Sequence, residues 1–516
     1  MGSVRDTRTI KAHIVNTTGR TLEDMPYLAL SHCWGKKSHA AAMTTNGNLK
    51  ARAISLPVSH LPKTILDAIL ITRQLGFRYL WIDTLCVIQD SIEDWETACA
   101  TMAAIYANSA CTIAASASED DEAGCFVPRD PQAIGWIGID FPYPIPSDYN
   151  LVSNRIICNQ EWPVPITSVA RRVILHPNVP EPRSSVETGP LFQRGWALQE
   201  RCLSPRMLHF TEQQVAWECE STWSYESLHL RDQVFVDTDM CLSKHKSDTH
   251  ALEEPAHLYE AWYSIVREFS RAHLTRITDQ LPALSGMAKA YLGKLPQDTY
   301  LAGLWKHDLV RGLWWAKNSD YAQALQRPNT YLAPSWSWAS VRGPIFHPEI
   351  GSFVDGPRIV HCEVKVAGLD PLGQVRDGVL EINGCLKVVR RGHQILPGFS
   401  LPPPRALIKL PKPYTPDDVT NLEERLSDRY RLIDRDMEDE LAPVGQIYFD
   451  DAKDSSEQYL YCLRMAKPAL QRYSTIHVLA FVPTGNVLEQ YRRVGIGEII
   501  RANWFDNSHT RTFKII

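Results

Sequence analysis

The chain is predicted to begin as an α/β protein, to continue as a mainly helical region and to end in a β-rich region. Three patterns in its 516 residues predict this order. Strand-like apolar runs alternate with helical periods up to about residue 225. Helical period dominates residues 226–350, and strand-like runs return in 351–516. The predicted domains are therefore 1–225, 226–350 and 351–516, in keeping with the length of the chain.

The first region has the pattern of parallel βαβ units. Short apolar runs predict buried strands at 27–31, 78–82 and 111–115. Apolar residues at helical spacing predict one helix over 63–75, and another that starts at Ser91 with Asp94 in a capping-box-like position. Strands that alternate with helices in this way form parallel sheets.

Regular patterns are interrupted and then return in the second half of this region. Residues 125–190 are rich in proline and aromatic residues without clear period, and predict an inserted segment of long loops with short strands. A helix is predicted over 195–203, followed by short strands at 207–210 and 214–218.

The later regions are predicted from the same periodicities. Helices are expected over 258–273 and 281–292, and the alternating residues 335–340 (SWSWAS) predict a strand. The tryptophans of 314–315 and 335–338 are interpreted as core or interdomain packing. In the last region, strands are predicted at 379–384, 477–482 and 496–500, and surface loops or a mobile segment at 402–416 and 421–440.

Composition excludes several classes of protein. A net charge of −5 argues against a nucleic-acid binder, and no run of 18 apolar residues predicts a membrane span. The start of the chain lacks a secretory pattern, so we expect a cytoplasmic protein whose 12 cysteines are reduced thiols. The absence of CxxC, HExxH, GxSxG and phosphate-loop motifs leaves no predicted metal or cofactor.

Three clusters of reactive residue types follow predicted strands or lie on a predicted helix. Ser31, His32 and Cys33 come directly after the first strand, where ligands bind in open α/β sheets. Asp83 and Cys86 follow the second strand, three residues apart on a turn or first helical turn that would lower the pKa of the thiol. Each of these clusters can also have a purely structural role, in which its side chains bond to loop backbone, cap a helix or pack in the core.

The third cluster is Glu200, four residues after Trp196 on one face of the predicted helix. A carboxylate beside a tryptophan loses solvent, which raises its pKa and suits acid–base chemistry. The alternative is an ordinary amphipathic helix on which Glu200 pairs with Arg194 or Arg201. The predicted catalytic residues are His32, Asp83, Cys86 and Glu200, and the predicted substrate-binding residues are Ser31, Trp34, Gln89, Arg194 and Trp196.

The three clusters resemble, in this order, the motifs of the fungal heterokaryon incompatibility (HET) family, in its stand-alone form. The resemblance rests on residues 30–35 (LSHCWG), 81–90 (WIDTLCVIQD) and 194–206 (RGWALQERCLSPR). It implies a fungal protein of non-self recognition and programmed cell death. It also implies a distant relation to the flavodoxin-like TIR domain, some members of which cleave NAD with a Trp-x-x-x-Glu glutamate; Trp196 and Glu200 have that spacing.

Three functions remain open at this stage. The first is a cell-death protein that hydrolyses a nucleotide such as NAD, with Glu200 stabilising an oxocarbenium-like sugar and Asp83 and His32 orienting the ribose or the water. The second is a cofactor-independent isomerase, dehydratase or cyclase of secondary metabolism, with His32 as base and Glu200 or Cys86 as acid in an apolar pocket. The third is a non-catalytic module that acts by self-association or through a partner incompatibility protein.

Overall fold

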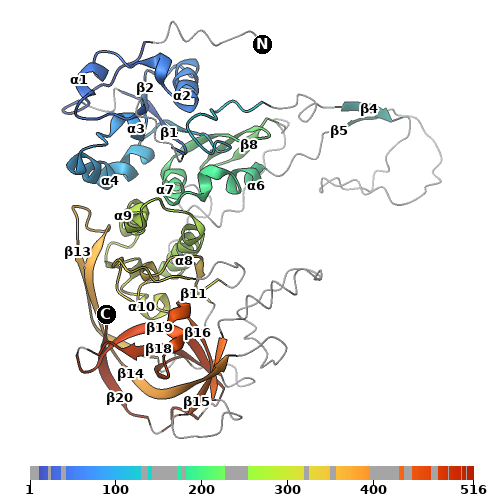
Figure 1. Ribbon diagram of the computed structural model, residues 1–516. Coiled ribbons are helices and arrows are strands. Elements are labelled where there is room, and N and C mark those ends of the chain that lie inside the picture. Colours follow the sequence, from blue (N-terminus) through green and yellow to red (C-terminus); the bar gives the residue numbers. More distant parts are fainter. Residues whose placement is uncertain are drawn as a thin grey trace, which may run out of the picture.

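The structure is a computed structural model, in which the described residues are 11–20, 25–35, 42–128, 137–141, 171–175, 182–226, 254–318, 325–348, 356–394, 429–434, 444–466, 475–485, 487–500, 503–506 and 508–516. Figure 1 shows the parts in chain order, with the N-terminal α/β region, the helices α8 to α10 and the C-terminal strands following one another. The predicted succession of an α/β, a helical and a β-rich region is confirmed.

The N-terminal sheet has six strands in the order β2-β1-β3-β6-β7-β8. Their bounds are β1 Tyr27–Ser31, β2 Tyr79–Trp81, β3 Cys111–Ala114, β6 Arg206–Phe210, β7 Val215–Cys219 and β8 Trp223–Tyr225. Strands β2, β1 and β3 are parallel, as the βαβ pattern predicts, and β6 joins them in parallel. Strands β7 and β8 run antiparallel, so the sheet is mixed. The reason is the short connections after β6, which permit only hairpin pairing.

Helices cover this sheet on both faces, because side chains of a strand point alternately to either side. On one face, Ile65 and Ala68 of α2 (Lys63–Gln74) pack with Leu28 and Leu30 in an apolar core. On the other face, α7 (Gly195–Leu203) contributes Ala197 to a smaller cluster, and α4 (Ile92–Ala107) lies against α7. This second face also carries the buried polar groups of the sheet.

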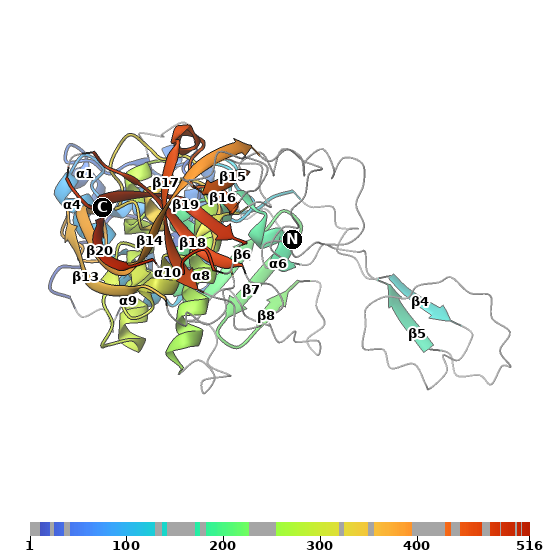
Figure 2. The ribbon, with the colours of Figure 1, turned by 90° about the horizontal axis from the view of Figure 1, so that it is seen from below.

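The predicted helix starts and strand ends of this region lie within one residue of those in the structure. The side chain of Ser91 accepts a hydrogen bond from the Asp94 amide at 3.2 Å, which is the predicted cap of α4. The remaining short elements are α1 Leu49–Arg52, η4 Val58–His60, α3 Asp83–Cys86, α6 Pro182–Glu187 and η5 Pro190–Gln193. Short strands are also present in the predicted insertion, since β4 (Ile137–Phe141) pairs with β5 (Arg171–Leu175). Figure 2 shows this pair standing apart from the other labelled elements.

The middle region contains α8 (Pro255–Arg271) and α9 (Pro282–Lys294), which confirm the predicted helices. Its short elements are η6 Ile277–Asp279, β9 Tyr300–Leu301, β10 Leu304–Trp305, α10 Leu309–Gly312, β11 Ala316–Lys317, η7 Trp338–Ser340 and β12 Ile345–Phe346. The strand predicted at 335–340 is wrong, because this segment is a turn followed by η7. All six of its residues are buried, so the Ser/Trp alternation does not separate an inner from an outer face.

The C-terminal strands form a closed ring. Strands β14, β15, β16, β19, β18 and β17 pair in that order, and β17 pairs again with β14. The bounds are β13 Arg358–Val366, β14 Val375–Gln394, β15 Arg429–Asp434, β16 Gly445–Phe449, η8 Ala452–Ser456, β17 Tyr459–Ala466, β18 Ile476–Pro483, β19 Gln490–Ile499 and β20 Thr510–Ile515. The long β14 makes closure possible, since its second half pairs with both β15 and β17.

One prediction for this region is wrong and one lies outside the described residues. The segment 421–440 was expected to be loop, but β15 lies inside it and pairs with β14 and β16. Leu432 and Ile433 are fully buried there, whereas the charges around them dominate the composition of the segment. The loop predicted at 402–416 lies outside the described residues.

The middle and C-terminal regions share one hydrophobic core. Trp262 and Trp305 belong to the same buried cluster as Leu380, Phe481 and Phe513. The tryptophans of the middle region are therefore core, as predicted. None of the helices in the described part of the chain is long and apolar enough to cross a membrane.

Candidate functional site

The three sequence clusters meet at the carboxyl edge of the parallel strands. Ser31 ends β1, and its hydroxyl donates a hydrogen bond to the Glu200 carboxylate on α7. Asp83 opens α3 directly after β2, and its Oδ1 lies 3.8 Å from Nδ1 of His32. The indole of Trp34 donates to the other oxygen of Asp83 at 2.8 Å. Residues up to 169 positions apart thus contact one another in a single site.

His32 is the centre of this site and lacks directed partners. Its Nε2 lies 3.0 Å from Asp121 Oδ1, with both side chains almost fully buried. The contact is short enough for an ion pair, but both ring nitrogens and Asp121 Oδ1 have no hydrogen-bond partner among the described residues. Burial lowers the pKa of His32, but Asp121 and Asp83 outweigh it, so that the pKa is raised above its ordinary value. A buried polar atom without a partner costs free energy, and use by a ligand or a reaction is one explanation for its presence.

Glu200 is a second buried group of this site, and the pKa of its carboxyl is raised. Burial raises its pKa, the hydrogen bond from Ser31 lowers it, and the negative charge of Asp83 raises it again; the result is a raised pKa. A carboxyl group of this kind can give and take a proton closer to neutral pH than an exposed glutamate can. The predicted desolvation of Glu200 is confirmed in direction.

Arg194 supplies positive charge at the edge of the site. Its guanidinium donates to the main-chain carbonyl of His32 and lowers the pKa of Glu200. Burial raises the pKa of the Cys33 thiol to about 11, although the positive charge of Arg194 lowers it. Cys33 is therefore protonated at neutral pH.

Two members of the site were missed by the sequence interpretation. Tyr106 on α4 donates its hydroxyl to the Leu30 carbonyl at 3.1 Å, and burial together with the charges of Glu200 and Asp83 raises its pKa well above the ordinary value. Asp121 follows β3, which ends at the same edge of the sheet as β1 and β2. This placement was a usable signal for Asp121, whereas the helical spacing around Tyr106 gives no sign of a polar role.

Cys86 has a different environment from the one predicted. It is the last residue of the short α3, not an early residue of a helix, and its sulfur accepts a hydrogen bond from the Ile82 amide at 3.4 Å. Although the residue is exposed, the protein around its sulfur raises the thiol pKa to about 11. The predicted lowering of this pKa is wrong, because burial of the sulfur, and to a smaller extent the negative charge of Asp83, raises it. A catalytic role for Cys86 stays a prediction, and only as a proton donor.

Gln89 and Trp196 support the site from outside it. The Gln89 amide donates to the carbonyls of Asp83 and Val87 at 3.0 Å each, and so braces the α3 turn. The Trp196 indole donates to Asp279 at 3.2 Å and thereby ties α7 to the middle region. Tryptophan and glutamate of the predicted pair thus bond to different partners, Asp279 and Ser31.

Of the two arginines considered as structural partners of Glu200, Arg194 acts on it through its charge, whereas Arg201 bonds to Glu218. Arg201 Nε bonds to Glu218 Oε2 at 3.0 Å, and His209 Nε2 lies 2.8 Å from the same oxygen. This second buried polar cluster connects α7 with β6 and β7 on the same face of the sheet. Among the residues that the structure describes, no three His, Cys, Asp or Glu side chains are grouped so that they could hold a metal ion.

One family model matches the part of the chain that holds these residues. Residues 27–200 match the family model described as "Heterokaryon incompatibility protein (HET)". The matched span contains β1, Asp83, Asp121 and Glu200, and so covers the whole cluster around His32. Comparisons with curated proteins and with solved structures found no similar chain.

Proposed function

We propose that this chain, whose residues 27–200 match the HET family model, is a cytoplasmic protein of fungal non-self recognition and programmed cell death. We propose further that the matched region hydrolyses a nucleotide such as NAD. One observation carries this proposal. The buried Glu200 carboxylate accepts a hydrogen bond from Ser31 beside the His32–Asp83 pair, at the edge of the sheet where α/β proteins bind ligands.

The topology supports kinship with the TIR domain. The parallel strands follow the order β2-β1-β3-β6, which is the order 2-1-3-4 that begins flavodoxin-like sheets. Glu200 lies on the helix between β3 and β6, at the spacing from Trp196 found in the NAD-cleaving members that the sequence resembles. Kinship of fold alone carries no activity, so the chemistry of the site has to carry the proposal.

The site has the groups that cleavage of an N-glycosidic bond requires. The bond between C1′ of the ribose and nicotinamide breaks, and its electron pair leaves with the neutral nicotinamide. The ionised Glu200 carboxylate stabilises the positive charge that develops on the sugar. Water then attacks C1′, and its proton passes to a base or to solvent. His32 and Asp83 orient the ribose or this water, with Ser31, Trp34 and Arg194 as further contacts.

The first test is a mass-spectrometric assay of the purified full chain with NAD. Wild type should release nicotinamide and ADP-ribose, and Glu200→Gln should slow this release by about a thousandfold, as expected for a group that acts only in the transition state. The matched control is Glu498→Gln. Glu498 is also buried, with a pKa raised to about 7, but it lies in the C-terminal ring, so its replacement should leave turnover unchanged.

The other outcomes separate the remaining functions. Equal turnover by Glu200→Gln and wild type would remove Glu200 from the mechanism. No turnover of NAD by folded wild type would overturn the hydrolase proposal. It would leave an acid–base enzyme of secondary metabolism that uses His32 and Glu200, or an interaction module. In the last case, toxicity on expression would survive Glu200→Gln and would depend on self-association or on a partner incompatibility protein.

A further inference from the structure

Helix α7, which carries Glu200, is buried on two faces. On one face, Ala197 packs with Ala114 of the N-terminal sheet. On another, Cys202 belongs to the large core that the middle region shares with the C-terminal strands, and Leu198 packs against that core. Figure 1 shows α9 next to α7, on the side away from the sheet. The helix is therefore held partly by residues outside 27–200, the span that the HET model matches.

The first tie between α7 and the middle region lies beside Arg194. The amide of His273 donates to the Gln193 carbonyl at 2.6 Å, and the carbonyl of His273 accepts from the Gly195 amide at 2.9 Å. These two bonds form a short parallel bridge between His273 and Arg194. Since the Arg194 guanidinium donates to the His32 carbonyl, the middle region holds a residue that reaches into the site.

The second tie lies next to Glu200. Gln199 is fully buried, and its Oε1 accepts from the main-chain amide of Gly286 on α9 at 2.9 Å. A Cβ atom at position 286 would collide with Gln199 Oε1 and with the Cβ of Ala103 on α4. The absence of a side chain at Gly286 thus permits the close approach of α9 to α4 and α7.

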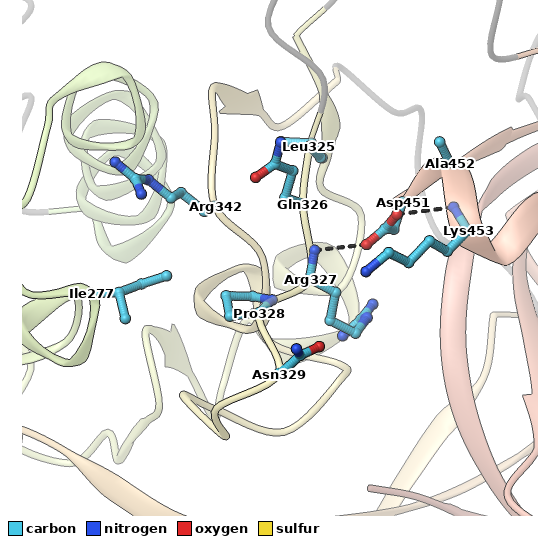
Figure 3. A pocket seen from close by; sticks show the side chains of 10 residues that line it. All are labelled: Ile277, Leu325, Gln326, Arg327, Pro328, Asn329, Arg342, Asp451, Ala452 and Lys453. Atoms are coloured by element: carbon cyan, nitrogen blue, oxygen red, sulfur yellow. Dashed lines mark hydrogen bonds between the residues drawn. The ribbon is translucent and has the colours of Figure 1, made fainter.

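The middle region is itself anchored in the C-terminal strands. The two regions share one hydrophobic core. Arg493 of β19 donates to the carbonyls of Leu313 and Trp315, at 2.6 and 2.5 Å. Figure 3 shows a further tie, in which Asp451 accepts from the Arg327 amide at 2.7 Å. Because a close-packed interior yields little, a support of this kind can fix the position of α7.

We propose, on the basis of the nucleotide hydrolysis put forward above, that the middle region positions Arg194 and Glu200 for the reaction. Gln199 and Gly286 are its positioning residues, because their hydrogen bond holds the main chain next to Glu200. A misplacement of about 1 Å in a reacting group can lower a rate constant by about a hundredfold. The site is therefore complete only when α9 is packed against α7.

The test compares two glycines of the same helix, α9. Gly286→Ala adds a methyl group at the contact with α7, whereas Gly293→Ala adds one in open space and is the matched control. In the full chain, Gly286→Ala should lower kcat for NAD by about a hundredfold with little change in KM, and Gly293→Ala should leave both unchanged. The double variant Gly286→Ala/Ala103→Gly, which removes an atom that the new methyl group meets, should restore part of kcat.

Two measurements separate a displacement of Glu200 from a loss of folded protein. The ionised carboxylate is the active form, and burial is the main cause that raises its pKa above 4.5. A displaced and better solvated Glu200 should therefore shift the acid limb of the kcat profile to lower pH, which a smaller folded fraction would not do. Hydrogen exchange followed by mass spectrometry should show faster exchange of the α7 amides in Gly286→Ala and wild-type exchange in Gly293→Ala.

The remaining outcomes decide against one part or the other. Unchanged kcat and pH profile in folded Gly286→Ala would overturn the proposal, even with faster exchange in α7. If Gly286→Ala does not fold, Gln199→Leu decides, because it removes the bond to α9 without adding a methyl group to Gly286; it should change kcat and the pH profile in the same direction.

The absence of NAD turnover by folded wild type would overturn the proposed hydrolysis. Hydrogen exchange then decides on the support by α9 alone. Faster exchange of α7 in Gly286→Ala would show that α9 holds this helix, and equal exchange would overturn that as well.

Discussion

Two buried charge clusters of this protein look alike in composition and differ in how completely their atoms are bonded. The cluster around His32 joins one imidazole to Asp83 and Asp121, with Glu200 beside it. The cluster around Arg493 joins one guanidinium to Asp450 in the C-terminal region. Most of their side chains are almost free of solvent, and Asp83 is the exception, with a side chain that is 22% exposed. Burial and charge alone therefore do not distinguish a functional site from a structural one.

In the Arg493 cluster, each of the three guanidinium nitrogens donates a hydrogen bond. Its guanidinium bonds to both Asp450 oxygens, at 3.0 and 3.2 Å, and to the carbonyls of Leu313 at 2.6 Å and Trp315 at 2.5 Å. It also lies 3.5 Å from the ring centroid of Trp315. The bonds to Leu313 and Trp315 connect the ring of strands to the middle region. The arrangement fits one conformation and leaves no group for a ligand.

The His32 cluster has the opposite character. Both ring nitrogens and one Asp121 oxygen lack directed partners in the described part of the chain, and three carboxyl groups share two cationic groups. Unused donors and an unbalanced charge cost stability, and proteins retain them where a ligand or a reaction uses them. We infer that the first cluster serves stability and the second serves function, and the following changes test that difference.

The largest expected effect is on the Arg493 cluster. Arg493→Met leaves Asp450 buried without its main partner, and should lower the free energy of unfolding by about 3–5 kcal/mol. Urea denaturation followed by circular dichroism measures the loss. A loss below about 1 kcal/mol would mean that Arg327, 3.9 Å from Asp450, replaces the missing charge.

Asp121→Asn should have an intermediate effect that depends on pH. Because the pKa of His32 is raised, its stabilisation is fully present below its ordinary value of 6.5 and is lost as the pH rises through the raised pKa. The variant should thus lose about 2 kcal/mol at mildly acidic pH and much less at alkaline pH. Denaturation curves at several pH values measure this, and a difference independent of pH would contradict the His32–Asp121 ion pair.

Trp34→Phe should cost about 1 kcal/mol, since it removes only the indole hydrogen bond to Asp83. If Trp34 orients Asp83, NAD turnover should fall further in this variant than the loss of folded protein accounts for. Both are measured on the same preparation, with Trp196→Phe as the matched control, which loses its bond to Asp279 outside the site. Equal loss of turnover in the two variants would mean that Trp34 has no special part in the site.

Glu200→Gln should change stability least. The raised pKa means that the folded protein prefers the neutral carboxyl, so wild type loses stability as the pH rises from 4.5 through the raised pKa. Glutamine stays neutral, and the variant should therefore match wild type within about 1 kcal/mol at low pH and exceed it at higher pH. A variant that is strongly destabilised at all pH values would make Glu200 a structural residue, like Arg493.

Local patterns determined most elements of the first region. The apolar run at β1, the spacing along α2 and the Ser91 cap each act within a few residues, and the structure has all three. The residue types at 31–32, 83 and 200 also pointed to the site before their contacts were known. The strand predicted at 335–340 was wrong because every side chain there is buried. The loop predicted at 421–440 was wrong because its charged residues outnumber the two buried apolar residues of β15.

The sequence by itself determined which residue types are present at the ends of the strands and which segments are amphipathic. Only the tertiary structure decided that Asp121 and Tyr106 join the site, that Arg201 pairs with Glu218, and that Cys86 has a raised pKa. The reason is physical. Helix and strand periods depend on neighbours along the chain, whereas burial, charge and proton affinity depend on neighbours in space.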